Sequence, residues 1–382
     1  MDFDLNDEQR QLKDSVERFL ADTHGDLAKR MAYMKEPRGY SPAVWKTYAE
    51  LGLLAVPFVE QHGGLGQGPT ETMIIAEALG KALAIEPYFS TVVLSGGALR
   101  HAGNTDLLKE LVPGIVEGRL TMALAHQERQ ARQDLADTAT TARADGKGGY
   151  TLEGEKCVVL HGDSADTLIV SARAEGRRAD RSGIGLFLID GRASGVTRRG
   201  YPTQDGMRAA DVALAAVRVG PERVLASPGQ GLEVLEAVVD EAIAALSAEA
   251  VGAMAALHEL TVDYLKTRKQ FGQPIGSFQV LQHRAVDMLT ALEQARSMAY
   301  YATMMLSEVD ARERRKAMAA TKVQIGRAAR YVGQEAIQLH GGIGMTMEYK
   351  AGHYFKRLTM IDMAFGDADH HLRALARAGG LG

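Results

Sequence analysis

The stretch that decides the fold reads Thr267-Arg268-Lys269-Gln270-Phe271-Gly272-Gln273-Pro274-Ile275-Gly276-Ser277-Phe278-Gln279. Long segments with helical periodicity lie on both sides of it, at residues 231–266 and 279–308. The stretch contains two glycines and a proline within five residues, which is too many helix breakers for a continuing helix. It therefore predicts a turn between two long antiparallel helices.

This turn carries more polar donors than a connection needs. Arg268 offers a planar fork of donors suited to phosphate oxygens, Phe271 offers a flat aromatic face, and Gln279 offers an amide. An arginine followed by a lysine is also what a solvated interhelical loop carries. A functional interpretation therefore depends on a second stretch of the chain.

That second stretch lies downstream, where a helix predicted over residues 317–339 stops at His340-Gly341-Gly342-Ile343-Gly344. One glycine would be an ordinary helix C-terminal cap. Three glycines in four residues also allow another backbone or a phosphate to come close, because no side chain is in the way. The segment is therefore a second candidate binding element.

The two stretches together resemble the acyl-CoA dehydrogenase family of flavoproteins. In that family, residues at these positions bind the adenosine diphosphate part of FAD and reach a flavin seated mainly on a neighbouring subunit. The resemblance covers nearly the whole chain. It implies that the cofactor is FAD and that its ligands here are Arg268, Phe271, Gln279, Gln338, Gly341 and Gly342.

Bulk properties exclude several classes of protein. A chain of 382 residues exceeds one ordinary core and should divide into two or three domains. The net charge of −4 does not suggest a nucleic-acid-binding protein. No apolar run approaches the ~20 residues that a membrane-spanning helix needs. The acidic start, Met1–Asp7, lacks the apolar segment of a signal peptide. The single Cys157 excludes an intrachain disulfide and fits a reduced, cytoplasmic environment.

The pattern along the chain changes twice. Residues 1–119 are helical in pattern, residues 120–228 alternate as strands do, and residues 229–382 are helical again. The charged connector Arg173–Ser182 is predicted to be a mobile surface loop. The resemblance implies an α+β multidomain fold with an N-terminal α domain, a central β-barrel and a C-terminal four-helix bundle.

The family's reaction is α,β-dehydrogenation of an acyl-CoA thioester, in which a carboxylate removes the α-proton. Most relatives carry this Glu in a Tyr-Glu-Gly-Thr turn, where this chain has Phe365-Gly366-Asp367-Ala368. Gly366 cannot accept a proton, and Asp367 is predicted to cap the last helix.

Some relatives place the base instead on the first helix of the C-terminal domain, and that position is Ala242 here. The neighbouring Glu241 is the candidate catalytic residue, although successive helix residues differ by ~100° in direction. Its other interpretation is a solvated or interface carboxylate.

Two further segments depart from the family. Glu128 keeps an acidic position after the first strand, but the Gly-Ser turn of the flavin-facing loop is missing. After Lys156, relatives have an aromatic residue and a hydroxyl, whereas residues 157–162 supply neither. His161 could donate to a cofactor or make a local hydrogen bond. No metal site is predicted, because the adjacent His370 and His371 cannot easily point at one ion.

The part of the site that reaches a neighbour's FAD is therefore intact, while the part that holds the chain's own flavin ring and base is altered. This asymmetry resembles the small subunits of heteromeric acyl-CoA dehydrogenases that act on dicarboxyl-CoA (such as pimeloyl-CoA) or steroid side-chain CoA substrates. It implies an enzyme that works with a homologous partner carrying the catalytic Glu, in a dimer of dimers, with electron-transferring flavoprotein as acceptor. The alternatives are a homotetramer that uses Glu241 or Asp367, a non-catalytic subunit that completes a partner's FAD site, and a flavin monooxygenase or oxidase of the same fold.

Overall fold

The computed structural model describes residues 5–379, so that Met1–Asp4, at the acidic start of the chain, lie outside it. Backbone contacts divide the chain into two compact units. Among the described residues, the first unit contains residues 5–32, Pro69–Ala84 and residues 243–379, and the second contains Tyr33–Gly68 and Ile85–Ala242. Element types follow the predicted order, with helices first, then strands, then helices.

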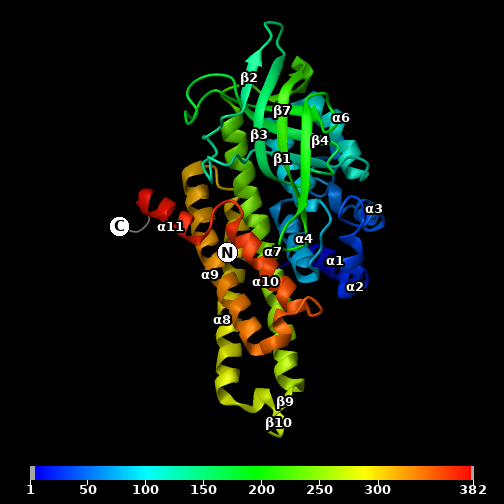
Figure 1. Cartoon of the computed structure of the whole chain (residues 1–382), viewed down its shortest axis with the longest axis vertical. Coiled ribbons are helices and arrows are strands. Elements are labelled where there is room, and N and C mark those ends of the chain that lie inside the picture. Colours follow the sequence, from blue (N-terminus) through cyan, green and yellow to red (C-terminus); the bar gives the residue numbers. More distant parts are fainter. Residues whose placement is uncertain (1–4, 380–382) are drawn as a thin grey trace. The chain divides into compact units, whose positions relative to one another are not determined.

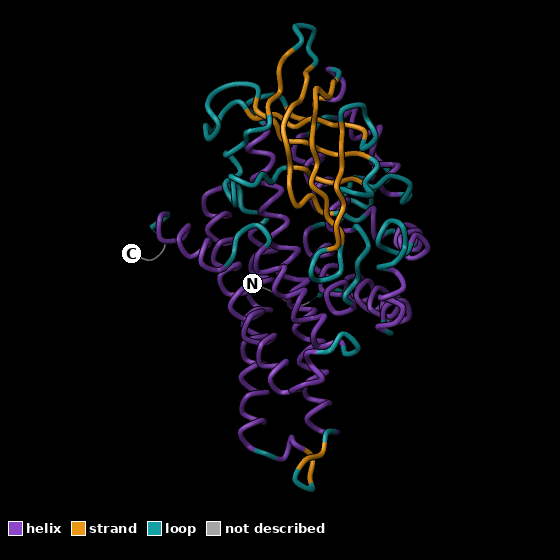
Figure 2. Tube along the Cα trace, viewed as in Figure 1, coloured by secondary structure: helices purple, strands orange, loops and turns teal. Residues whose placement is uncertain are grey.

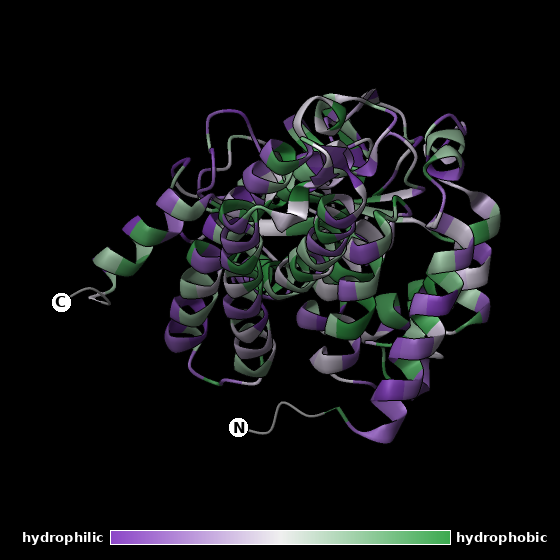
Figure 3. Ribbon diagram, turned by 90° about the horizontal axis from the view of Figure 1, so that it is seen from below, coloured by the Kyte–Doolittle hydropathy of each residue, from purple (hydrophilic) through white to green (hydrophobic). Residues whose placement is uncertain are grey.

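The first unit is helical, and α8, α9 and α10 lie side by side within it (Figure 1). The long helix α7, Gly231–Thr267, begins in the second unit and ends in the first. The other helices of the first unit are α1 Asp7–His24, α2 Leu27–Tyr33, α4 Pro69–Ala82, η5 Ile275–Ser277, α8 Gln279–Met305, α9 Ala311–His340, η6 Gly341–Met345, α10 Lys350–Met363 and α11 Ala368–Arg377. Both hydrophobic and hydrophilic residues occur along these helices (Figure 3). An apolar face of a helix can then pack against its neighbours while a polar face meets solvent.

The second unit combines shorter helices with one sheet. Its helices are α3 Pro42–Glu50, η1 Leu53–Ala55, η2 Glu60–His62, the π-helix η3 Phe89–Ser95, α5 Gly96–Ala102, α6 Thr105–Val116 and η4 Pro221–Arg223. Its strands, orange in Figure 2, are β1 Met122–Ala125, β2 Thr141–Ala144, β3 Tyr150–Leu160, β4 Thr167–Arg173, β5 Ile184–Asp190, β6 Val196–Pro202, β7 Arg208–Val219 and β8 Val224–Ala226.

The sheet is open, which corrects the prediction of a closed β-barrel. Its strand order is β6-β7-β3-β2-β4-β5-β8, and β1 pairs in parallel with β4. Between the described residues no pairing joins β6 to β8, so both are edge strands. The edge strand β6 carries the exposed, charged Arg199, and charge is a common protection for an unpaired edge. Buried side chains such as Leu168, Val170 and Phe187 form the apolar core on the sheet.

Two helix starts are capped by side chains, and one of these caps is the predicted Asp367. Asn6 caps α1 by accepting the Gln9 backbone N–H at 2.8 Å, and the Gln9 side chain accepts the Asn6 N–H in return. This capping box satisfies two backbone donors that a helix start leaves free. Asp367 caps α11 in the same position, accepting the His370 N–H at 2.8 Å.

The connection between α7 and α8 is more ordered than the predicted turn. Two short strands, β9 Lys269–Gln270 and β10 Gln273–Pro274, pair as a hairpin. Phe271 and Gly272 form its turn with φ of +54° and +81°. Positive φ at both central residues is the geometry of a type I′ turn. A phenylalanine in the left-handed region is unusual, and its ring is 90% exposed here.

Two glycines allow α4 and α7 to cross in close contact within the first unit. A Cβ atom on Gly80 would lie 1.9 Å from the Glu249 carbonyl oxygen, and one on Gly252 would lie 1.8 Å from that of Glu77. The two helix backbones therefore touch directly. Any side chain at either position would force the helices apart.

We expect Gly252→Ala to destabilise the protein by about 1–3 kcal/mol or more, because overpacking shifts two backbones. Gly342→Ala is the matched control, since a Cβ there meets no atom within 4 Å. Urea unfolding of both variants measures the difference. Equal midpoints for the two variants would contradict the tight crossing.

Candidate functional site

The predicted cofactor residues lie at the ends of three helices of the first unit. Arg268 follows α7, Phe271 is in the hairpin, and Gln279 is the first residue of α8. Gln338 lies in the last turn of α9, and Gly341 begins η6. All of them, and Gly342, are exposed.

An aromatic cluster joins the two motifs. The Tyr264 carbonyl accepts the Arg268 backbone N–H at 2.8 Å. The Tyr264 ring packs on the His340 ring at a centroid distance of 4.7 Å, and Tyr349 packs on His340 at 5.1 Å. Since His340 directly precedes Gly341, these contacts fix the end of α7 next to the end of α9. The first motif and the second therefore belong to one surface.

His340 is suited to this structural role because it is neutral. The ring is buried, and its Nδ1–H donates to the Ala336 carbonyl at 2.8 Å. Burial lowers the pKa of His340 below its ordinary value, so the ring stays uncharged at neutral pH. The ring can therefore pack between two tyrosines without burying a charge.

The surface has the chemistry of a nucleotide diphosphate site. Gly341 adopts φ +62° and ψ −140°, a conformation that in practice requires glycine. A Cβ on Gly341 or Gly342 would meet no atom within 4 Å, so their backbone faces open space. Within residues 5–379 the Arg268 guanidinium has no hydrogen-bond or ion-pair partner. An unpaired guanidinium, an open backbone and an exposed ring fit a pyrophosphate and an adenine.

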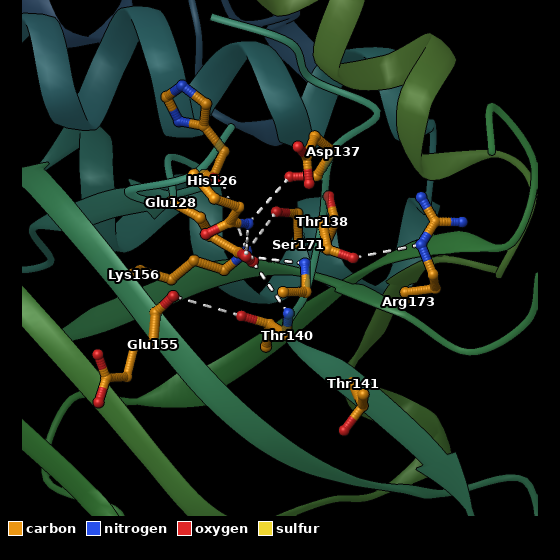
Figure 4. A network of polar contacts seen from close by, with 12 residues as sticks. His126, Glu128, Asp137, Thr138, Thr140, Thr141, Glu155, Lys156, Ser171 and Arg173 are labelled. Carbon is orange, nitrogen blue, oxygen red and sulfur yellow. Dashed lines mark hydrogen bonds and ion pairs between the residues drawn. The ribbon is translucent and has the colours of Figure 1, made fainter. Parts of the chain in front are cut away.

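Glu128 is held inside the second unit by a buried ion pair (Figure 4). Its Oε1 accepts from Lys156 Nζ at 2.6 Å, and Lys156 also donates to Ser171 Oγ at 3.0 Å. The backbone N–H groups of Ala139 and Thr140 donate to the same carboxylate at 2.8 and 3.1 Å. Burial acts to raise the pKa of Glu128, but Lys156 outweighs it and lowers that pKa to about 2. Glu128 is a structural anion.

The segment after Lys156 is irregular. The register of β3 against β7 shifts between Lys156 and Val159, and Val158 has a positive φ of 51°. Cys157 is free and buried, and burial raises the pKa of its thiol. His161 is also buried, with its ring edge-on to Tyr40 at 6.0 Å.

Glu241 is paired with two basic side chains of α5. Its Oε2 accepts from Arg100 Nη2 at 2.5 Å, and its Oε1 lies 2.9 Å from His101 Nε2. Burial acts to raise the pKa of Glu241, but the Arg100 charge and the His101 hydrogen bond lower it overall. A carboxylate in this state accepts a proton poorly. Glu241 sits in a structural ion pair.

The turn before α11 has no room for a side chain at residue 366. Gly366 has a φ of +101°, and a Cβ there would lie 2.6 Å from His370 Cδ2. The preceding Phe365 also has a positive φ, and its carbonyl lies 2.9 Å from His371 Nε2. The buried Lys322 fixes the end of α10 by donating to the Ile361 carbonyl at 2.6 Å. A glutamate at residue 366 would require a different turn.

Two other kinds of site are absent from the described part of the chain. Residues 5–379 contain no group of three His, Cys, Asp or Glu residues that could hold a metal ion. None of the helices in that range is both long and apolar enough to cross a lipid bilayer.

Three family models match successive parts of the chain. They are the acyl-CoA dehydrogenase N-terminal domain at residues 6–119, the middle domain at 123–217 and the C-terminal domain at 229–380. This chain belongs to the acyl-CoA dehydrogenase family. The family's helical N-terminal, β-sheet middle and helical C-terminal domains are therefore confirmed. Four-helix packing in the last domain and the domain limits 1–119, 120–228 and 229–382 stay predictions.

Individual relatives agree with this. The 2-methylacyl-CoA dehydrogenase of Solanum tuberosum is 30% identical over 96% of this chain and 89% of its own length. The structure of a variant of the Tcur3481-Tcur3483 steroid ACAD is 28% identical, covers 98% of both chains and has a TM-score of 0.87. The FAD complex of PigA is 27% identical, covers both chains fully and has a TM-score of 0.90. The family and these neighbours establish FAD as the cofactor.

Sequence reasoning missed three residues that join the two motifs into one surface: Tyr264, His340 and Tyr349. A signal was available, because Tyr264 lies one helical turn before Arg268 and His340 adjoins Gly341. Their mutual contact, however, joins segments that are distant in the chain.

We expect acid to weaken the fold through His371. Burial lowers the pKa of His371 to about 4, against an unfolded value of ~6.5. Between these values the unfolded chain binds more protons, so stability is lost as pH falls from ~6.5 to ~4. His371→Gln keeps a donor for the Phe365 carbonyl and should flatten the fall in melting temperature between pH ~7 and pH ~4.5. An unchanged slope would show that His371 does not carry the effect.

Proposed function

We propose that this chain is a subunit of an FAD-dependent acyl-CoA dehydrogenase whose catalytic Glu comes from a homologous partner chain. One observation carries the proposal: residue 366 is a glycine in a turn with no room for a side chain, where most relatives carry the base. The second candidate for the base is Glu241, and its two carboxylate oxygens already contact Arg100 and His101. The reaction class is oxidation of the α,β bond of an acyl-CoA thioester.

In this proposal the chain contributes half of a cofactor site. FAD, when bound, accepts the hydride that leaves the β-carbon. Arg268 pairs with the pyrophosphate through charge-assisted hydrogen bonds, and Phe271 offers its exposed ring to the adenine. Gln279 and Gln338 supply amides, and Gly341 and Gly342 let the cofactor approach the backbone.

Association with further chains is proposed from exposed apolar side chains of the first unit. Val280, Val286 and Leu289 are exposed along α8. Met345, 76% exposed, and Met347 follow the Gly341 turn. Exposed apolar side chains beside a binding element are typical of an interface. We propose a dimer of dimers in which this face meets the chain that holds the flavin ring.

Two alternatives remain within the family. A homotetramer with Glu241 as base would need that carboxylate to leave Arg100 and His101. A non-catalytic subunit would bind a partner's FAD and never contact the acyl group.

The structural relative Tcur3481-Tcur3483 is named for two components, which supports the heteromeric proposal. Electron-transferring flavoprotein is the proposed acceptor, and the free Cys157 supports a reducing cytoplasm.

We expect Arg268→Ala to lower FAD retention by the assembly, most clearly at low free flavin. Loss of a charge-assisted pair typically costs ~1.5–3 kcal/mol, or about tenfold or more in affinity. Flavin absorbance per protein after dialysis measures it. Lys269→Ala is the control, because it removes the same charge one residue along the same exposed hairpin. Equal retention by wild type and Arg268→Ala would contradict the assignment.

The catalytic prediction separates the alternatives. The chain purified alone should dehydrogenate acyl-CoA thioesters negligibly, and activity should appear with a partner that supplies Glu. Glu241→Gln should leave the activity of the co-assembled enzyme within a few-fold, whereas loss of a base costs ~10²–10⁴-fold. If Glu241→Gln abolishes turnover while flavin stays bound, Glu241 is the base and the heteromeric proposal fails.

A further inference from the structure

Residues 341–349, here called the glycine segment, connect α9 to α10 and carry two of the proposed cofactor contacts, Gly341 and Gly342. The segment buries little of its own surface, since residues 341–348 are all exposed except Gly344. A segment with few buried contacts opens easily unless its neighbours hold it. The side chains that fix its conformation must therefore come from the helices on either side.

The first of these side chains is a buried histidine directly before the glycine segment. His340 is 3% exposed, and its ring packs on Tyr349, the last residue of the segment, at a centroid distance of 5.1 Å. This contact joins the start of the segment to its end. The Tyr264 ring of α7 packs on the same imidazole at 4.7 Å. His340 therefore closes the segment into a loop and holds that loop against α7.

The second side chain is a buried histidine of α10. His353 is also 3% exposed, and its Nε2–H donates to the Met347 carbonyl at 3.0 Å. Lys356, about one turn later on α10, contacts the same methionine, with Nζ 3.0 Å from Met347 Sδ. His353 and Lys356 thus hold the second half of the glycine segment, as His340 holds its two ends.

The middle of the glycine segment packs directly on both helices. A Cβ on Gly344 would lie 3.1 Å from His340 Cβ and 3.3 Å from the Ile337 carbonyl oxygen of α9. A Cβ on Gly352 of α10 would lie 3.0 Å from the Gly344 carbonyl oxygen. Close-packed backbone does not absorb a local change by small adjustments. We therefore expect a change at either histidine to displace the segment.

No carboxylate among the described residues forms an ion pair with His340. Its ring faces two phenols, Tyr264 and Tyr349, and its Nδ1–H donates to the Ala336 carbonyl at 2.8 Å. Burial, Tyr264 and the exposed Asp263 of α7 all raise the pKa of Tyr349, so this carboxylate acts on the phenol. Burial outweighs the carbonyl hydrogen bonds and lowers the pKa of His340.

Positive charge surrounds His353. Burial lowers its pKa, and Arg30 on α2 and Lys356 on α10 lower it further, whereas the hydrogen bond to the Met347 carbonyl acts in the opposite direction. Arg30 is itself 2% exposed and donates to the Leu83 carbonyl at 2.9 Å, which holds it in place. A proton on His353 would add a third positive charge to a buried region of low dielectric constant.

We propose that His340 and His353 are positioning residues that hold Gly341 and Gly342 in place for the diphosphate of FAD, and that a proton on either ring releases the segment and the cofactor. This inference rests on the proposed function and adds a dependence on pH to its cofactor site. Once the segment opens, each imidazole titrates near its ordinary pKa of ~6.5. The open form then binds more protons, so acid below ~6.5 favours opening by at most about tenfold per histidine and pH unit.

The affinity of the assembled protein for FAD tests the inference. The dissociation constant of wild type, followed by flavin fluorescence, should rise about tenfold or more between pH ~7.5 and pH ~5.5. His340→Phe keeps a ring between the two tyrosines, and His353→Gln keeps a donor for the Met347 carbonyl, but neither new side chain can gain a charge. The double variant should bind FAD within a few-fold of wild type at pH ~7.5 and lose most of the dependence on pH.

His258→Gln is the matched control. His258 is a half-buried histidine of α7 whose Nε2 lies 3.0 Å from the Ala285 carbonyl oxygen. The change removes a titratable group from the same unit and keeps a donor for that carbonyl. This variant should keep the dependence on pH that wild type shows.

Hydrogen exchange gives a reading that needs no FAD. After correction for the intrinsic effect of pH, the amides of the glycine segment should exchange faster at pH ~5.5 than at pH ~7.5 in wild type and not in the double variant. Far-UV circular dichroism at each pH shows whether the helices stay folded, which separates the segment from the global effect of His371. Loss of FAD only where the helices melt would overturn the inference.

The remaining outcomes separate the inference from the function. If the assembled wild type binds no FAD at pH ~7.5, the proposed cofactor site fails and the inference fails with it. If wild type binds FAD and the double variant keeps the same dependence on pH, only the inference fails. If the double variant binds no FAD at any pH, the hydrogen exchange of its glycine segment decides, and exchange that still rises in acid overturns the inference.

Discussion

The buried pair of Glu128 and Lys156 is the interaction on which the sheet of this chain depends. It joins the segment after β1 to the start of β2 through two backbone N–H groups, and to β3 and β4 through Lys156 and Ser171. Removing one partner would leave an uncompensated buried charge, at a cost of about 3–5 kcal/mol. The same interaction decides a chemical question. The carboxylate of Glu128 holds strands together and is not available for catalysis.

Ion pairing limits the chemistry elsewhere in the second unit as well. Glu241 is acidic and close to a position that carries a base in some relatives, yet Arg100 and His101 hold both of its oxygens. A base needs a free lone pair and a pKa near the working pH. Both oxygens of each carboxylate accept hydrogen bonds, and pairing lowers the pKa of Glu241 and of Glu128. The pairing also fixes the position of Arg100.

Backbone conformation explains two features of the first unit that side-chain chemistry does not. At Phe271-Gly272 and at Phe365-Gly366 a phenylalanine with positive φ precedes a glycine with positive φ. In the first case the turn closes a hairpin and leaves the phenyl ring exposed. In the second it brings residue 366 against His370 and leaves no space for a side chain. The same local device therefore exposes a candidate cofactor contact in one place and excludes a catalytic carboxylate in another.

Sequence alone determined the features that depend on residues close together in the chain. The order of helices and strands, the cap at Asp367, the limits of α7 and the family could all be read from local patterns, because capping and periodicity act within a few residues. The tertiary structure decided the rest. The sheet is open because its two edge strands, β6 and β8, do not pair with each other. Glu128 meets Lys156 across 28 residues and Glu241 meets Arg100 across 141. Such partners are chosen by how distant segments pack, which no local pattern encodes.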